Sequence, residues 1–301
     1  MDHGVFLPVS GAAATRSGLI HAAQTAERLG FTTVWAADRI IIPWTIETEY
    51  AYNWSSAFIV PPEKPFLESM TVLAFLAGAT ETIRLGVSVL VAPYRDPILW
   101  AKTAATIDRL SEGRFVLGVG IGWMEEEFVA LGRADVYRRR AKVADEQLRV
   151  ARNLFSDEEH CSFHGDYYDY DDIAFNPKPT HVPIWCGGES AGAQRRAGLH
   201  GDAWFPYFAR VTPTELKSRF ENVRRHANGR DVTLNTCLSV EVTDALVEQE
   251  PDRLRGTPEQ IADALRQFDD IGVEHVALQF IVGRYPERLR QMERLMPVIT
   301  G

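Results

Sequence analysis

Short apolar runs alternate with longer amphipathic segments from one end of the chain to the other. Runs such as 85–91 contain mainly Val and Leu, which is typical of strands buried on both faces of a parallel sheet. The strands predicted in this way span residues 4–8, 33–37, 84–91, 115–120, 183–187, 202–206, 235–242 and 275–282.

Capping residues mark the helices between these strands. Thr257, Pro258 and Gln260 have the residue types of an N-cap, a first turn and a third helical position. One apolar stripe then runs through 261–271, and Gly272 is expected to end the helix. The same capping pattern recurs at 212–215.

Eight strands that alternate with about eight helices in 301 residues indicate an α/β protein, a (β/α)8 TIM barrel. A doubly wound open sheet is the alternative, but no GxGxxG turn follows the first strand. We expect one domain over 1–301, because no Gly/Ser-rich linker divides the chain. Long loops follow the second and fourth strands, at 40–67 and 156–181, and the second of them has a hairpin pattern.

Composition narrows the class of protein. The net charge of −9 argues against nucleic acid as a partner, but it leaves room for a small anion held by backbone amides. No run approaches eighteen apolar residues, and no basic region precedes the first apolar run, so we expect a cytoplasmic protein without a membrane span. Cys161, Cys186 and Cys237 form no CxxC pair and are expected to be buried thiols.

The common hydrolytic motifs are missing from the sequence. It contains no GxSxG elbow, no P-loop and no HExxH, and its eight histidines have no metal-ligand spacing. We therefore expect no metal and predict that a cofactor supplies the chemistry for a small-molecule substrate.

The clearest candidate binding feature is Gly187-Gly188-Glu189-Ser190, which follows a predicted strand and opens a predicted helix. Glycines allow close approach of the backbone, and a helix N-terminus offers free N–H groups, so a phosphate could bind here. The alternative is a plain turn in which Ser190 caps the helix. The position late in the barrel favours the phosphate.

A second group of candidates lies near the second strand. Asp38 could act as an acid or base or orient a ring nitrogen, or it could form an ion pair that holds the long loop. Arg138, Arg139 and Arg140 could attract an acidic ligand, or form a solvated helix turn. Five aromatic residues could wall a pocket or simply pack the loop; they are Trp44, Tyr50, Tyr52, Trp54 and Phe58.

Four segments resemble those of the bacterial luciferase-like oxidoreductases, which use flavin or deazaflavin. They are residues 30–38, 83–90, 108–120 and 183–204, and they occur in the same order and spacing as in that family. The stretch 118–123 and the insertion at 163–165 also look like those of coenzyme F420-dependent members.

The resemblance implies a flavin or deazaflavin bound at the carboxyl ends of the barrel strands. Gly187, Gly188, Glu189 and Ser190 would hold its phosphate. A non-proline cis peptide is expected at or near Ser88-Val89, with Leu90 beside it, where the third strand would bulge against the ring. Asp38 would lie beside the pyrimidine side of that ring. A homodimer is likewise implied by the resemblance.

Two positions depart from the family pattern. Arg39 stands where deazaflavin dehydrogenases often have His, and Trp123 where they often have Glu, so both candidate catalytic positions beside Asp38 lack a proton-transfer group. We therefore expect reduction of an activated C=C, C=N or nitro group by coenzyme F420. The alternatives are an FMN-dependent monooxygenase served by a separate flavin reductase, and a flavin-binding protein without turnover.

Overall fold

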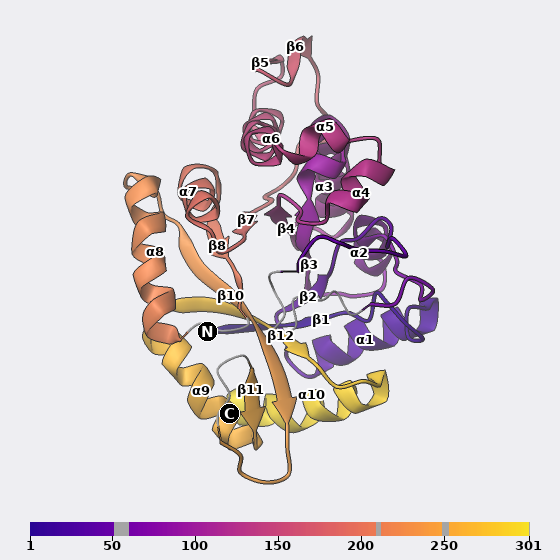
Figure 1. Ribbon diagram of the computed structural model, residues 1–301, viewed down its shortest axis with the longest axis vertical. Helices are drawn as coiled ribbons and strands as arrows, with labels where there is room; N and C mark the ends of the chain where they lie inside the picture. The colour runs from indigo at the N-terminus through magenta and orange to yellow at the C-terminus, as the bar shows by residue number, and fades with distance from the viewer. Residues whose placement is uncertain (51–59, 209–211, 249–252, 301) are drawn as a thin grey trace.

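The computed structural model describes residues 1–50, 60–208, 212–248 and 253–300. Its main sheet is a closed parallel barrel in which the strands follow one another as β12, β1, β2, β3, β4, β7, β8 and β10, and β10 also pairs with β12. Helices lie between successive strands and surround them (Figure 1). The prediction of a (β/α)8 barrel is confirmed, and the open-sheet alternative is wrong.

The strands and helices have the following bounds. The strands are β1 Asp2–Phe6, β2 Thr33–Ala36, β3 Arg84–Val91, β4 Phe115–Gly120, β5 Cys161–His164, β6 Asp169–Ile173, β7 Ile184–Gly187, β8 Ala203–Phe205, β9 Tyr207–Phe208, β10 Thr233–Val242, β11 Leu254–Gly256 and β12 Val273–Phe280. The helices are α1 Arg16–Arg28, α2 Ser69–Ala77, the 3-10 helix η1 Ala92–Tyr94, α3 Pro97–Leu110, α4 Glu125–Ala130, α5 Ala134–Tyr137, α6 Arg140–Phe155, α7 Ala191–His200, α8 Pro213–Ala227, α9 Pro258–Asp270 and α10 Tyr285–Thr300.

Three strands begin two residues before the predicted start. β1 pairs with β12 from Asp2 onward, and β10 begins at the polar Thr233. Apolar runs mark the part of a strand that packs in the core, whereas pairing here extends through a polar layer at the amino ends of the barrel strands. The predicted bounds of β3 and β4 agree with the structure.

Aromatic side chains fill the middle of the barrel. The ring centre of Trp35 lies 5.1 Å from that of Trp185 and 4.8 Å from that of Phe205. Gly4 and Gly86 leave room for the indole, because a Cβ on either would lie within 2.5 Å of a Trp35 atom. This layer separates the two ends of the barrel interior.

The second predicted insertion contains the antiparallel hairpin of β5 and β6, which projects at the opposite end of the molecule from α10 (Figure 1). The predicted capping box at Thr257 and Gln260 is present at the start of α9. All three cysteines are buried and unpaired. Within the described ranges, no helix combines the length and apolarity that a bilayer span requires.

Candidate active site

The turn at 187–190 connects β7 to α7 at the carboxyl end of the barrel. Gly188 has a φ of +95°, a left-handed conformation that favours glycine, and a Cβ there would lie 3.0 Å from the Ala193 Cβ. Ser190 is the N-cap and accepts a hydrogen bond from the Ala193 N–H at 3.2 Å. The capping interpretation is therefore correct for Ser190. The helix N-terminus that it caps also offers backbone donors to an anion.

Side chains from neighbouring elements hold this turn from behind. Trp204 Nε1 donates to the Gly188 carbonyl at 2.9 Å, and Gln194 Nε2 donates to the Glu189 carbonyl at 3.0 Å. With its carbonyls engaged in this way, the turn has a fixed shape before any ligand arrives.

Glu189 brings an unusual carboxyl group to the turn. Burial raises the pKa of Glu189 to about 7, and the Arg219 guanidinium, 3.8 Å away, opposes that rise. Glu215, which shares Arg219, adds to the rise. Glu189 is thus partly protonated near neutral pH, which reduces its repulsion of an anion.

A non-proline cis peptide joins Ser88 and Val89, at the position that the family resemblance implies. The pairing of β3 with β4 is interrupted there, between Val87 and Leu90. The Val89 side chain packs among glycines of β4 and β7. A Cβ would lie 2.5 Å from Val89 Cγ2 if placed on Gly120, and 3.0 Å from Val89 Cγ1 if placed on Gly187.

The Val89 side chain and the turn at 187–190 are therefore neighbours. Gly187, expected to approach the phosphate, makes room for Val89 instead, while Gly188 and Glu189 come directly after it. The structure brings the β3 feature and the β7–α7 turn together in one mouth of the barrel. We call this pair, Val89 with residues 187–190, the shelf.

Asp38 has no free position for proton transfer. Both of its carboxylate oxygens bind Arg95, each at 2.8 Å, and Ser69 Oγ and the Val91 N–H donate to them at 2.8 and 2.9 Å. The side chain is fully buried. The geometry favours the ion-pair interpretation, although the partner is Arg95 rather than a residue of the long loop. Through Val91, Asp38 fixes the end of β3.

Arg39 is also engaged in a buried ion pair. Its guanidinium donates to Glu127 Oε2, and Tyr94 Oη donates to the same oxygen at 2.8 Å. The other oxygen of Glu127 accepts from the N–H groups of Ile40 and Ile41 at 2.8 and 3.2 Å. Glu127 thus holds the start of the loop after β2 against α4.

Glu127 is a residue that sequence reasoning missed. It is the third of three consecutive glutamates at the start of α4, and acidic residues in a first helical turn normally lie in solvent. The available signal was its place four residues after Trp123, the position where the family resemblance leads us to expect a carboxylate. The neighbouring Glu126 also holds the loop, by accepting from the N–H groups of Glu47 and Thr48.

Trp123 lies between two partners from the β2 loop. Its ring centre is 4.8 Å from that of Tyr50 and 5.3 Å from the Arg39 guanidinium carbon. Trp44, another member of the predicted aromatic group, is 81% exposed. The remaining members of the predicted aromatic group lie outside the described residues; they are Tyr52, Trp54 and Phe58.

Two residues of the basic triple, which lies between α5 and the start of α6, make local contacts. Arg139 pairs with Asp135, and Arg140 donates to the carbonyls of Gly122 and Tyr137. These contacts agree with a helix turn rather than with a site for an acidic ligand.

A group of three polar side chains lies at the ends of β9, β10 and β12, and sequence reasoning missed Tyr207 among them. Tyr207 Oη donates to Gln279 Oε1 and lies 3.3 Å from Ser239 Oγ. Burial raises the pKa of Tyr207 above its ordinary value, so the phenol stays protonated. Tyr207 escaped notice because the apolar run before it stops at Pro206.

A sequence profile of the luciferase-like monooxygenases matches residues 1–255. The chain belongs to the luciferase-like monooxygenase family. An uncharacterized protein of Mycobacterium tuberculosis is 31% identical over 204 residues, which cover 67% of this chain and 69% of that protein. The FMNH(2)-dependent dimethylsulfone monooxygenase of Pseudomonas putida is 33% identical over 174 residues, which cover 56% of this chain and 47% of the enzyme.

Solved structures share the fold over nearly the whole chain. An F420-dependent secondary alcohol dehydrogenase superposes with a TM-score of 0.80 at 18% identity, and the match covers 100% of this chain and 99% of that one. The coenzyme F420 dependent tetrahydromethanopterin reductase from Methanopyrus kandleri gives 0.75 at 16% identity, with 99% of both chains covered. At such identities the likeness shows the fold alone.

Proposed function

We propose that this chain is an oxidoreductase that binds coenzyme F420 on the shelf and reduces an activated C=C, C=N or nitro group of a small organic substrate. The observation that carries the proposal is the contact between Val89 and the turn at 187–190. It puts an apolar support for a flat ring directly beside a helix N-terminus that favours an anion.

The residues present fit such a cofactor. Gly120 and Gly187 make room for the Val89 side chain, and the conformation of Gly188 lets the backbone approach a ligand closely. Asp38 and Arg95 fix the end of β3, which keeps Val89 in place. When bound, a reduced deazaflavin supplies a hydride from its C5.

The side chains around the shelf support reduction rather than the oxidation of an alcohol. The carboxylates of Asp38 and Glu127 are committed to arginines, so neither is poised to remove a proton from a hydroxyl. Tyr207 stays protonated and donates its one O–H to Gln279 Oε1, so it is not a base that could remove a hydroxyl proton either. Hydride transfer to an activated acceptor needs no such base.

The deazaflavin is the first choice because the stretch 118–123 and the insertion at 163–165 resemble those of coenzyme F420-dependent members. Structural coverage does not separate the two cofactors, since F420-dependent enzymes and monooxygenases both match nearly the whole chain. The test is stopped-flow mixing of the reduced coenzyme–protein complex with nitro, enone and imine acceptors. We expect faster oxidation than with the free coenzyme. If the complex and the free coenzyme were oxidised at equal rates by all three acceptor classes, the proposal would be wrong.

A second candidate is an FMN-dependent monooxygenase that receives reduced FMN from a separate reductase. A sequence relative supports it, because the FMNH(2)-dependent dimethylsulfone monooxygenase is 33% identical over 56% of the chain. Oxygen consumption in the presence of FMN and a flavin reductase tests this candidate. Binding of either cofactor without turnover in both assays would favour a non-catalytic flavin-binding protein.

A further inference from the structure

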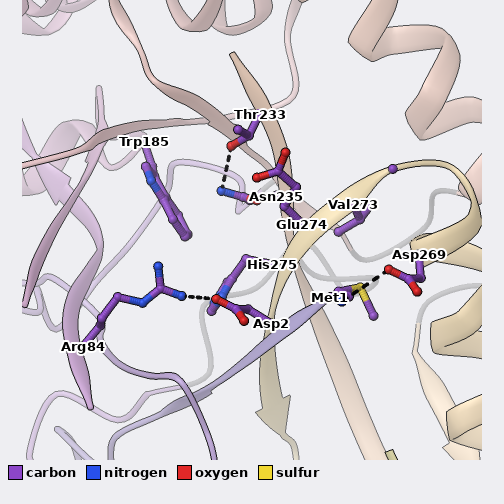
Figure 2. A pocket seen from close by; sticks show the side chains of 11 residues that line it. Met1, Asp2, Arg84, Trp185, Thr233, Asn235, Asp269, Val273, Glu274 and His275 are labelled. Carbon is purple, nitrogen blue, oxygen red and sulfur yellow. Dashed lines mark hydrogen bonds and ion pairs between the residues drawn. The ribbon is translucent and has the colours of Figure 1, made fainter. Parts of the chain in front are cut away.

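A cavity of about 520 Å³ opens at the amino end of the barrel, away from the shelf. Residues at the starts of β1, β3, β10 and β12 line it, together with the Trp185 ring (Figure 2). The aromatic layer of Trp35, Trp185 and Phe205 lies between this cavity and the carboxyl end. We call it the lower cavity, and its size is within the range of small-molecule sites.

Two buried polar side chains lie deep in the lower cavity. Asn235 and His275 are direct neighbours in the pairing of β10 with β12, and they are only 1% and 2% exposed. Among the described residues, neither Asn235 Oδ1 nor His275 Nδ1 has a hydrogen-bond partner. Since a buried polar group without a partner is unfavourable, a ligand that satisfies both gains affinity.

The direction of each missing hydrogen bond follows from the contacts that are made. Trp35 Nε1 can only donate, and it donates to His275 Nε2 at 3.1 Å, so the proton of the neutral imidazole is on Nδ1. Burial lowers the pKa of His275 well below its ordinary value, which keeps the ring neutral. Asn235 Nδ2 donates to Thr233 Oγ1 at 3.4 Å, which leaves Oδ1 as the acceptor.

The lower cavity therefore presents one donor and one acceptor on paired residues of adjacent strands. Its rim carries the Arg84–Asp2 ion pair, the ion pair of the Met1 ammonium with Asp269, and the carboxylate of Glu274. This balance disfavours an anion. A cation without an acceptor atom would leave the His275 N–H unpaired.

We propose that the lower cavity binds a small, neutral, planar molecule with adjacent C=O and N–H groups, a lactam or an amide. The carbonyl accepts from His275 Nδ1, the N–H donates to Asn235 Oδ1, and the ring packs against Trp185 (Figure 2). The site is separate from the shelf, so a failure of the proposed function would leave this proposal unaffected.

The test compares two probes that differ by one hydrogen-bond donor. Calorimetric titration with 2-pyridone and with N-methyl-2-pyridone measures how much the ligand N–H contributes to affinity, because methylation leaves Asn235 Oδ1 unpaired. We expect 2-pyridone to bind at least about tenfold more tightly. Equal affinity for both probes would overturn the proposal. The absence of any 2-pyridone binding would overturn it as well.

Two variants locate the binding. Asn235→Leu keeps the size of the side chain and removes the acceptor, so it is expected to abolish the preference for 2-pyridone. Gly188→Asp alters the shelf at the other end of the barrel and is expected to leave 2-pyridone affinity within about twofold of the wild-type value, since the sites are separate. Binding that survives Asn235→Leu, or that is lost in Gly188→Asp, would contradict a site in the lower cavity.

Discussion

Charged side chains near the shelf are used mainly to fix the backbone. Asp38 joins Arg95, Ser69 and the end of β3, and Glu127 joins Arg39 to the first residues of the long loop. Buried ion pairs of this kind depend on both members, because removing one leaves an uncompensated charge in the interior.

We predict that Glu127→Gln lowers the free energy of unfolding by about 3–5 kcal/mol, since it leaves the Arg39 guanidinium buried without its carboxylate. Urea denaturation measures the change. Glu125→Gln, in the same helical turn but exposed, is the matched control and should stay within about 0.5 kcal/mol of the wild type.

The double variant Arg39→Met with Glu127→Gln removes both charges but keeps an acceptor oxygen for the N–H groups of Ile40 and Ile41, so it should recover most of the lost stability. If Glu127→Gln were as stable as the control, the pair would have no structural role.

We predict that Glu189 makes the proposed anion binding on the shelf depend on pH. Because burial raises its pKa to about 7, the side chain is mainly neutral at pH 6 and mainly charged at pH 8. Affinity for a phosphate-bearing cofactor should therefore fall as the pH rises through 7, while Arg219 reduces the effect.

Fluorescence titration at a series of pH values in wild type and Glu189→Gln isolates this group from titration of the ligand. The variant should have the flatter profile, and Glu221→Gln, an exposed control on α8, should keep the wild-type slope. Parallel profiles for wild type and Glu189→Gln would show that Glu189 does not face the anion.

At the scale of elements, the fit of β3 against β4 decides the shape of the shelf. We predict that Gly120→Ala lowers the free energy of unfolding by about 1–3 kcal/mol, since its Cβ would lie 2.5 Å from Val89 Cγ2 and force that side chain to move. Cofactor affinity should fall at least about tenfold, because the support for the ring shifts.

Adding Val89→Ala to Gly120→Ala removes the atom that clashes, so the double variant should regain stability, as chemical denaturation would measure. Gly78→Ala is the control, because a Cβ there meets nothing within 4 Å. A Gly120→Ala protein with unchanged stability and unchanged cofactor affinity would contradict the packing described for Val89.

For the whole molecule, the alternation of apolar runs and capped helices was enough to predict the barrel. Apolarity could not give the true starts of β1, β10 and β12, because their first inward positions are polar residues such as Asp2 and Asn235. Those residues form the layer that lines the lower cavity. The same polar residues thus explain why these strand starts were predicted too late and why a second candidate site lies there.

Prediction of the site was limited in a similar way. Local motifs identified the turn at 187–190 and, through the family resemblance, the Ser88–Val89 peptide, since each lies within a few consecutive residues. The partners of Asp38 and Arg39 are 57 and 88 positions away along the chain. Such long-range pairs need a tertiary structure, because charge patterns in the sequence do not specify them.

The central claim is that a deazaflavin binds on the shelf, and the most direct test is fluorescence titration of the apoprotein with coenzyme F420 and, separately, with FMN. We predict saturable binding of coenzyme F420. Gly188→Asp should abolish it, because the new carboxylate faces the phosphate, while Gly188→Ala, which adds only a strained Cβ, should retain part of it. Tight FMN binding with no response to coenzyme F420, or unchanged coenzyme F420 affinity in Gly188→Asp, would contradict the account.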